Sequence, residues 1–100
     1  MMPGRDQIID ATMARSIQAD AERKHPLMAW IVTQDQDAYD GQFVARLVTD
    51  APTPYVLMGR TLGELHSKLP YGTQWYDRAP NDPPEVVEIW FLANRSGRRY

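Results

Sequence analysis

Residues 27–33, Leu27-Met28-Ala29-Trp30-Ile31-Val32-Thr33, decide the fold, because six of these seven consecutive side chains are apolar. Side chains of a strand alternate between two faces, so an unbroken apolar run predicts a central strand covered on both sides. His25-Pro26 stands directly before it, and a residue that precedes proline is disfavoured in a helix. The run therefore predicts the centre of a sheet, entered from a helix that ends at its edge.

Further strands follow toward the C-terminus. Residues 42–49 predict the second strand, with Phe43, Ala45 and Leu47 on one face, and residues 55–58 predict a short third one. Residues 85–92 predict the last strand, whereas residues 73–78 fit either a strand or a loop. Polar, proline-containing segments separate these runs. The pattern predicts an α+β fold with an antiparallel sheet of four or five strands.

The clearest local signal is Gly59-Arg60-Thr61-Leu62-Gly63-Glu64-Leu65. Thr61 and Glu64 have the spacing of a capping box, which satisfies free backbone donors at a helix start. The predicted helix covers residues 61–69, ends at Pro70-Tyr71-Gly72, and carries an apolar stripe of Leu62, Leu65 and Leu69. We expect this stripe to lie on one face of the sheet, against Val87, Ile89 and Phe91 or against the matching face of residues 27–33.

A second helix is predicted near the N-terminus, over residues 6–24, with Asp6 as its cap. Its apolar stripe recurs every four residues, at Ile9, Met13, Ile17 and Ala21. Asp20 falls within the stripe and interrupts it. We therefore expect a peripheral helix, giving the order helix-β-β-β-α-β.

Composition limits the class of protein. The 100 residues predict a single domain, with the peripheral helix at 6–24, a sheet core at 27–92 and a flexible tail at 93–100. The net charge of −2 provides no basic field for nucleic acid or membrane, and the arginines of the tail do not change that expectation. The chain has no cysteine, no signal-peptide pattern and no long apolar run, which favours a cytoplasmic location.

No catalytic or metal motif is apparent. Residues 35–41 contain three aspartates, but their spacing differs from a calcium loop, and Arg46 stands where that loop needs a bidentate glutamate. His25 and His66 lack a metal-ligand pattern, and His66 is expected at the core boundary with one nitrogen in water. We expect no metal, no cofactor and no catalytic residue.

Two other clusters allow a functional interpretation. The carboxylates of Asp77, Asp82, Glu85 and Glu88 could flank a cleft as an acid–base pair, but solvated surface carboxylates are the commoner case and are expected here. Aromatic side chains crowd the second half of the chain. They could line a ligand groove, although core packing is the favoured interpretation.

Residues 27–69, with the Gly59-Arg60-Thr61-Leu62-Gly63-Glu64-Leu65 entry to the helix, resemble the HicB-like antitoxin fold. That resemblance implies a β-β-β-α-β module and a partner toxin. No DNA-binding segment of that family follows the sheet, and the N-terminal helix is additional. Residues 82–90 resemble segments of small uncharacterised bacterial proteins.

The leading functional hypothesis is a non-enzymatic interaction module, because the central strands are apolar on both faces and one short helix covers only one of them. We expect a homodimer through the second face, which would carry Trp90 and Val86, or through the sheet edge, or else binding of another protein. The N-terminal helix, folded back over that face, is the alternative cover. Alternatives are a HicB-like antitoxin and a small-ligand or catalytic pocket near His66 and the aromatics. The candidate interaction residues are Trp30, Trp75, Tyr76, Val86, Trp90, Ile9, Met13 and Ile17.

Overall fold

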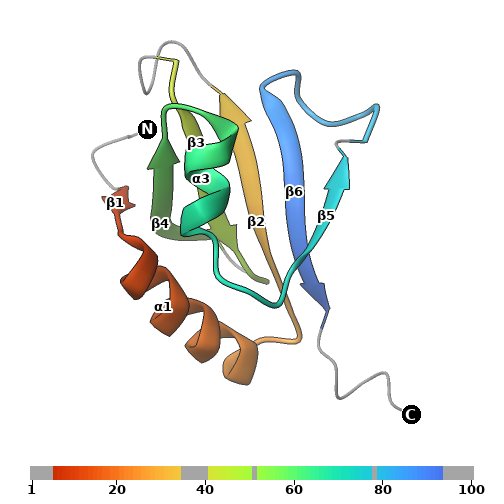
Figure 1. Cartoon of the computed structure of the whole chain (residues 1–100). Coiled ribbons are helices and arrows are strands. Elements are labelled where there is room, and N and C mark those ends of the chain that lie inside the picture. The colour runs from red at the N-terminus through yellow and green to blue at the C-terminus, as the bar shows by residue number, and fades with distance from the viewer. Residues whose placement is uncertain (1–5, 35–40, 51, 78, 94–100) are drawn as a thin grey trace.

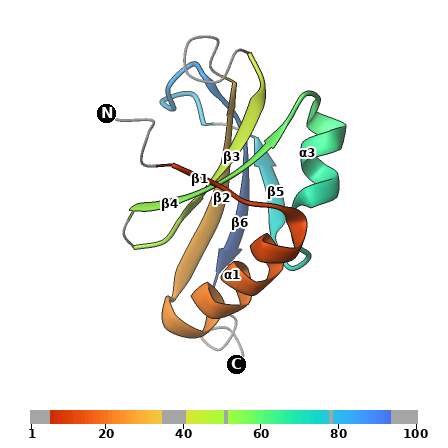
Figure 2. The same ribbon diagram turned by 90° about the vertical axis from the view of Figure 1, so that its left-hand side faces the viewer.

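A computed structural model describes residues 6–34, 41–50, 52–77 and 79–93, and shows an α+β fold with two helices on one face of a mixed six-stranded sheet (Figures 1 and 2). The elements, in chain order, are β1 (Gln7–Ile8), α1 (Ala11–Lys24), β2 (Leu27–Gln34), β3 (Phe43–Val48), β4 (Pro52–Gly59), α3 (Leu62–Lys68), β5 (Gln74–Asp77) and β6 (Val86–Ala93). Neither helix has the length and apolar composition needed to cross a bilayer. The aspartates at 35–40 and the predicted tail from residue 94 lie outside the described residues.

The strand order is β1-β4-β3-β2-β6-β5, with β2 in the interior as its apolar sequence predicts. The five strands β2 to β6 pair antiparallel, and β5 shows that residues 74–77 form a strand. The sixth strand, β1, pairs parallel with β4 and corrects the expectation of a purely antiparallel sheet of four or five strands. The observed order is therefore β-α-β-β-β-α-β-β rather than helix-β-β-β-α-β.

The N-terminal helix starts later than predicted. Asp10, not Asp6, is its cap and accepts a hydrogen bond from Met13 N at 2.8 Å. Before it the chain is extended, and Ile9 N donates to Val56 O at 2.9 Å. Asp6 instead forms a two-pronged ion pair with Arg46, at 2.7 and 2.8 Å. Sheet hydrogen bonds and this ion pair explain why helix does not extend back to residue 6.

The buried face of α1 also differs from the predicted stripe. Ala14, Gln18 and Ala21 are its buried residues, whereas Met13 is 47% exposed. Gln18 accepts a hydrogen bond from Trp30 Nε1 at 2.9 Å and donates one to Tyr71 O at 2.7 Å. A buried amide is stable when its polar atoms are satisfied. Gln18 thus joins α1 both to the central strand and to the loop after α3.

The entry to α3 is capped largely as predicted. Thr61 Oγ1 accepts from Glu64 N at 3.0 Å, while the Glu64 carboxylate accepts from Arg60 N at 3.1 Å. Gly59 precedes this turn, and a Cβ added there would stand 2.8 Å from Leu65 N. Glycine at the end of β4 therefore allows the helix backbone to approach the sheet closely, which seats Leu65 in the core.

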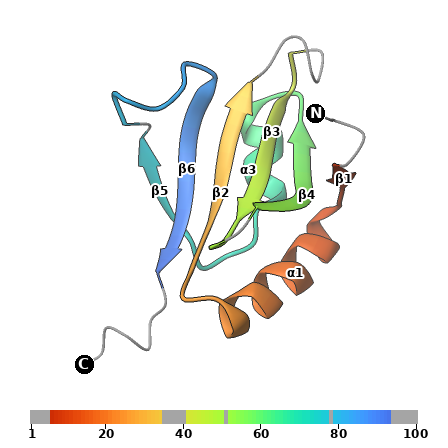
Figure 3. The ribbon, with the colours of Figure 1, turned by 180° about the vertical axis from the view of Figure 1, so that it is seen from behind.

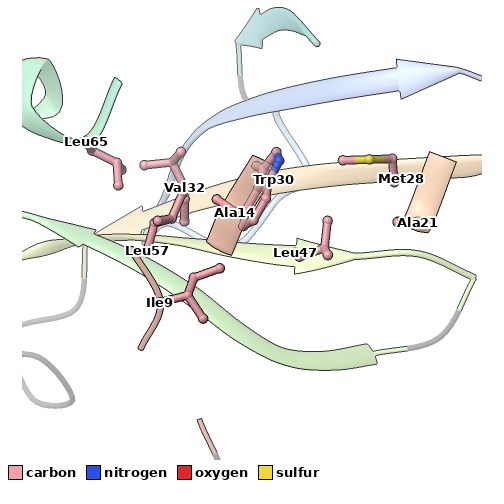
Figure 4. Close-up of a cluster of buried hydrophobic side chains, with 10 residues drawn as sticks. Ile9, Ala14, Ala21, Met28, Trp30, Val32, Leu47, Leu57 and Leu65 are labelled. Carbon is pink, nitrogen blue, oxygen red and sulfur yellow. The ribbon is translucent and has the colours of Figure 1, made fainter. Parts of the chain in front are cut away.

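The core lies between the two helices and one sheet face (Figure 4). Leu65 meets the β2 face that carries Trp30 and Val32, as one of the two predicted arrangements requires. The labelled core residues of Figure 4 are Ile9, Ala14, Ala21, Met28, Trp30, Val32, Leu47, Leu57 and Leu65.

The two faces of β6 are assigned differently from the prediction. Trp90 pairs with Trp30 and packs against the core, so it lies on the helix side of the sheet. Ile89 and Phe91 pair with Ile31 and Ala29 on the opposite side. Only Val87 of the expected trio contacts the core cluster. A register shift between Val32 and Thr33 displaces the start of β6 relative to simple alternation.

Candidate functional site

A buried carboxylate lies at the centre of a polar cluster on the helix side of the sheet. Glu88 is 6% exposed and stands in β6, opposite Val32 of β2 on one side and Asp77 of β5 on the other. Burying a charged group is costly unless it is paired and hydrogen-bonded. The position of Glu88 therefore depends on the side chains around it.

Three rings surround the carboxylate of Glu88. Its Oε1 lies 2.5 Å from His66 Nε2 and accepts from Trp90 Nε1 at 2.8 Å. Its Oε2 accepts from Trp75 Nε1 at 3.0 Å. His66 also meets Trp90 edge-on, with ring centroids 5.2 Å apart. We call Glu88, His66, Trp75 and Trp90 the Glu88 cluster; it joins α3 to both strands of the β5–β6 hairpin.

The environment determines the charge state of Glu88. Burial by itself raises the pKa of this carboxyl, because the charged form loses water. Hydrogen bonds from Trp90, His66 and Trp75, together with the charge of His66, outweigh that effect, and the pKa is lowered from the usual 4.5. Glu88 is therefore an anion at neutral pH, and it accepts all three of these hydrogen bonds as the charged form.

The sequence-based expectation of a solvated carboxylate at position 88 is wrong. The alternation of side chains along β6 puts Glu88 on the same face as Trp90. An inward-facing glutamate needs a hydrogen-bond partner, and this was the sequence signal that could have indicated one. His66 is confirmed as a boundary residue, with 37% of its side chain exposed. The described residues contain no group of three or more potential metal ligands, and His66 with Glu88 forms a histidine–carboxylate pair.

The Glu88 cluster predicts a specific acid sensitivity. Replacing Glu88 with glutamine should lower the free energy of unfolding at pH 7 by about 1.5–3 kcal/mol, the usual scale of hydrogen bonds to a charged group. Because the folded pKa is lowered, this stabilisation is complete above the ordinary pKa of 4.5 and is lost as the pH falls through the lower folded value. Urea denaturation from pH 7 to pH 3 measures the difference.

Glu85→Gln is the matched control, because Glu85 is exposed and directly precedes the first residue of β6. Its cost should stay within about 0.5 kcal/mol at every pH, as for most surface substitutions. An equal loss in both variants, or a Glu88→Gln difference that does not shrink in acid, would contradict a paired anion at position 88.

His66 of the Glu88 cluster also lines a small cavity. Its volume is about 240 Å³, and it lies between α1 and the segment from the end of α3 into the following loop. Trp75 and Trp90 do not line this cavity, so it differs from the predicted pocket of His66 together with these aromatics. The lining residues are Ala11, Arg15, His66, Ser67, Lys68, Leu69, Pro70 and Tyr71.

The opposite side of the sheet is a second candidate surface. Seen from behind, β2, β6 and β5 have neither helix in front of them (Figure 3). Apolar side chains lie next to one another there through the strand register. Leu27 and Tyr76 are exposed, and the others are partly exposed. We call the open face the surface formed by Leu27, Ala29, Ile31, Tyr76, Ile89 and Phe91.

The predicted interaction residues are distributed over core and surface. Trp30, Ile9 and Val86 are buried, so they contribute packing within the chain and offer no surface in this fold. Ile17 and Trp90 are partly buried against the core. Trp75, Tyr76 and Met13 are exposed, but only Tyr76 belongs to the open face. The exposed candidates therefore do not form one surface.

Comparisons of the chain with protein families, with curated proteins and with solved structures found no match.

Proposed function

We propose that this protein is a non-enzymatic interaction module that acts as a homodimer through the open face. The observation that supports it is an apolar surface on β2, β6 and β5 that neither helix covers. Large contiguous apolar patches are uncommon on monomeric proteins and usually mark an interaction site. The proposed role is therefore association, with the helix side of the sheet providing the rigid core.

The charge distribution favours a second copy as the occupant. None of the residues that define the open face is an Asp, Glu, His, Lys or Arg, so two copies would not repel each other there. Arg46, the neighbour of Ile31 in β3, is already paired with Asp6. Homodimer interfaces are self-complementary and more apolar than the average protein surface.

The register explains why the apolar patch is confined to one half of the sheet. Arg46 lies beside Val56, and Val56 lies beside Ile8 of β1. To reach Asp6, which precedes β1, the arginine side chain extends across β4, and Val56 is fully buried. The ion pair thus lies over Val56 of β4, and the β2, β6 and β5 half is the part proposed to bind a partner.

Light scattering at micromolar concentration tests the proposal. The chain should scatter as a particle of twice its 11.5 kDa mass. Leu27→Glu combined with Tyr76→Glu should convert it to the monomer, because two like charges per subunit would be desolvated at the interface. Both residues are about half exposed, at 49% and 47%, so the double variant should fold.

Met13→Glu is the matched control, because Met13 is equally exposed but lies on α1. This variant should remain dimeric. A monomeric parent chain at all concentrations would refute the proposal. So would a dimer that Met13→Glu dissociates while the double variant stays associated.

A HicB-like antitoxin is the second candidate. The order β2-β3-β4-α3, with Gly59 and the Thr61 cap at the helix entry, is the arrangement that the resemblance of residues 27–69 implies. In that case the partner would be a small basic RNase-like toxin. Its gene next to this one, and co-purification of the two products, would favour this function over a homodimeric module.

A further inference from the structure

We propose that the cavity between α1 and the end of α3 binds a small organic anion, with the charged group of the ligand against Arg15. This site is separate from the open face, and its function does not depend on the dimer. The cavity holds about 240 Å³, below the roughly 300–1,000 Å³ typical of sites for drug-sized ligands. Its size therefore suits a single small molecule.

The charge of the lining has one sign. Arg15, His66 and Lys68 line the cavity, and none of its described lining residues carries a carboxylate. Apart from the Tyr71 phenol, the ionisable side chains that line the cavity are basic. This lining contrasts with the whole chain, which has a net charge of −2. Such a lining favours an oxyanion such as a carboxylate or phosphate group.

Three of the polar lining side chains already have partners. His66 Nε2 is bound by Glu88 at 2.5 Å, and Ser67 Oγ donates to Glu64 O at 2.6 Å. Lys68 Nζ donates to Met58 O at 2.7 Å and also approaches the Glu64 carboxylate. These contacts fix the α3 side of the cavity before a ligand arrives, which lowers the entropy cost of binding.

Arg15 differs from these three residues. Among the described residues its hydrogen-bond partner is the hydroxyl of Thr12, at 3.5 Å, and no carboxylate neutralises it. Arg15 and Ala11 are one helical turn apart on α1, which places both on the same side of the cavity. The guanidinium is thus the cation available for a two-pronged bond to an oxyanion.

The remaining wall is apolar and suggests the rest of the ligand. Leu69, Pro70 and Tyr71 line the cavity, and Tyr71 is 97% exposed. The backbone carbonyl of Tyr71 accepts a hydrogen bond from Gln18 Nε2 at 2.7 Å. The backbone of the loop is therefore fixed at this point, while the Tyr71 ring is exposed to solvent. An aromatic or otherwise planar group next to the charged group could stack on this ring. We therefore infer a ligand with an anionic head and a small apolar body.

Amide chemical shifts of the ¹⁵N-labelled full chain test the proposal, with benzoate, phenyl phosphate and acetate as probes. Benzoate or phenyl phosphate should shift the amides of Ala11, Arg15, Tyr71 and residues 66–69 saturably, and whichever binds more tightly identifies the head group. Acetate should bind more weakly, because it has no ring. Arg15→Gln should weaken binding about tenfold or more, as loss of a charge-assisted hydrogen bond does.

Arg23→Gln is the control, because Arg23 lies on the same helix but pairs with Asp20. It should leave the affinity unchanged. Tyr71→Ala should weaken benzoate and leave acetate binding as it was. The proposal is overturned if none of the three probes produces saturable shifts at this cavity, or if Arg15→Gln and Arg23→Gln weaken binding equally.

Discussion

Replacing Trp30 with alanine is expected to lower the free energy of unfolding by about 3–5 kcal/mol, the range for truncating a buried aromatic residue. Trp30 is fully buried at the centre of β2, between Leu47 of β3 and Trp90 of β6 (Figure 4). Its loss leaves a large cavity and also removes the donor to Gln18. Urea denaturation at one fixed protein concentration measures the change.

Trp30→Phe separates the two contributions. Phenylalanine keeps most of the buried ring but has no N–H, so Gln18 Oε1 loses its partner. This variant should cost about 1–3 kcal/mol, the penalty for a buried acceptor left unsatisfied together with a small packing loss. If Trp30→Ala costs no more than an ordinary surface substitution, the arrangement of β2 described above is wrong.

Replacing Leu65 with alanine should cost about 2–5 kcal/mol, as core leucine truncations do. Leu65 is fully buried and is the buried residue of α3. The helix backbone cannot easily move to close the gap, because Gly59 already sets the closest approach between β4 and α3. Thermal or urea unfolding of the purified variant gives the difference.

Leu62→Ala provides the comparison on the same helix. Leu62 is only partly buried against the core, so the same truncation should cost clearly less than at position 65. A Leu65→Ala cost below about 0.5 kcal/mol, the range of surface substitutions, would mean that the stripe of α3 is not part of the core.

Much of the fold could be predicted where one sequence signal was strong. The apolar run of β2 identified the central strand, and Thr61 with Glu64 identified the start of α3. These elements follow from local rules of alternation and capping. The pairing order of the strands came only from the structure.

Local rules failed where a tertiary contact decided the outcome. A strand of two residues, β1, has no periodicity to detect, and its existence depends on β4 lying beside it. Gln18 breaks the apolar stripe of α1 because its amide is matched to Trp30, a residue 12 positions away. Hydrophobic periodicity cannot anticipate a buried polar pair of this kind.

The sequence grouped His66 with the aromatic side chains, but the pairing of His66 with Glu88 was missed for a similar reason. Glu88 and His66 are 22 residues apart, and nothing in their spacing indicates a pair. A glutamate beside an acidic loop is usually solvated. Only the placement of α3 on the helix side of the sheet brings the imidazole to the carboxylate, and Trp75 comes from yet another strand. The cavity near Arg15 likewise depends on how α1 meets α3.

The outermost strands of the sheet have a consequence for how the protein can aggregate. β1 has two residues and β5 has four, so neither edge offers a long row of free backbone groups to another chain. Long, flat edges are templates for fibrils, and short edge strands are one way that natural proteins avoid them. Association of this chain into open-ended polymers of strands is thereby disfavoured, and the proposed dimer uses a face of the sheet rather than its edges.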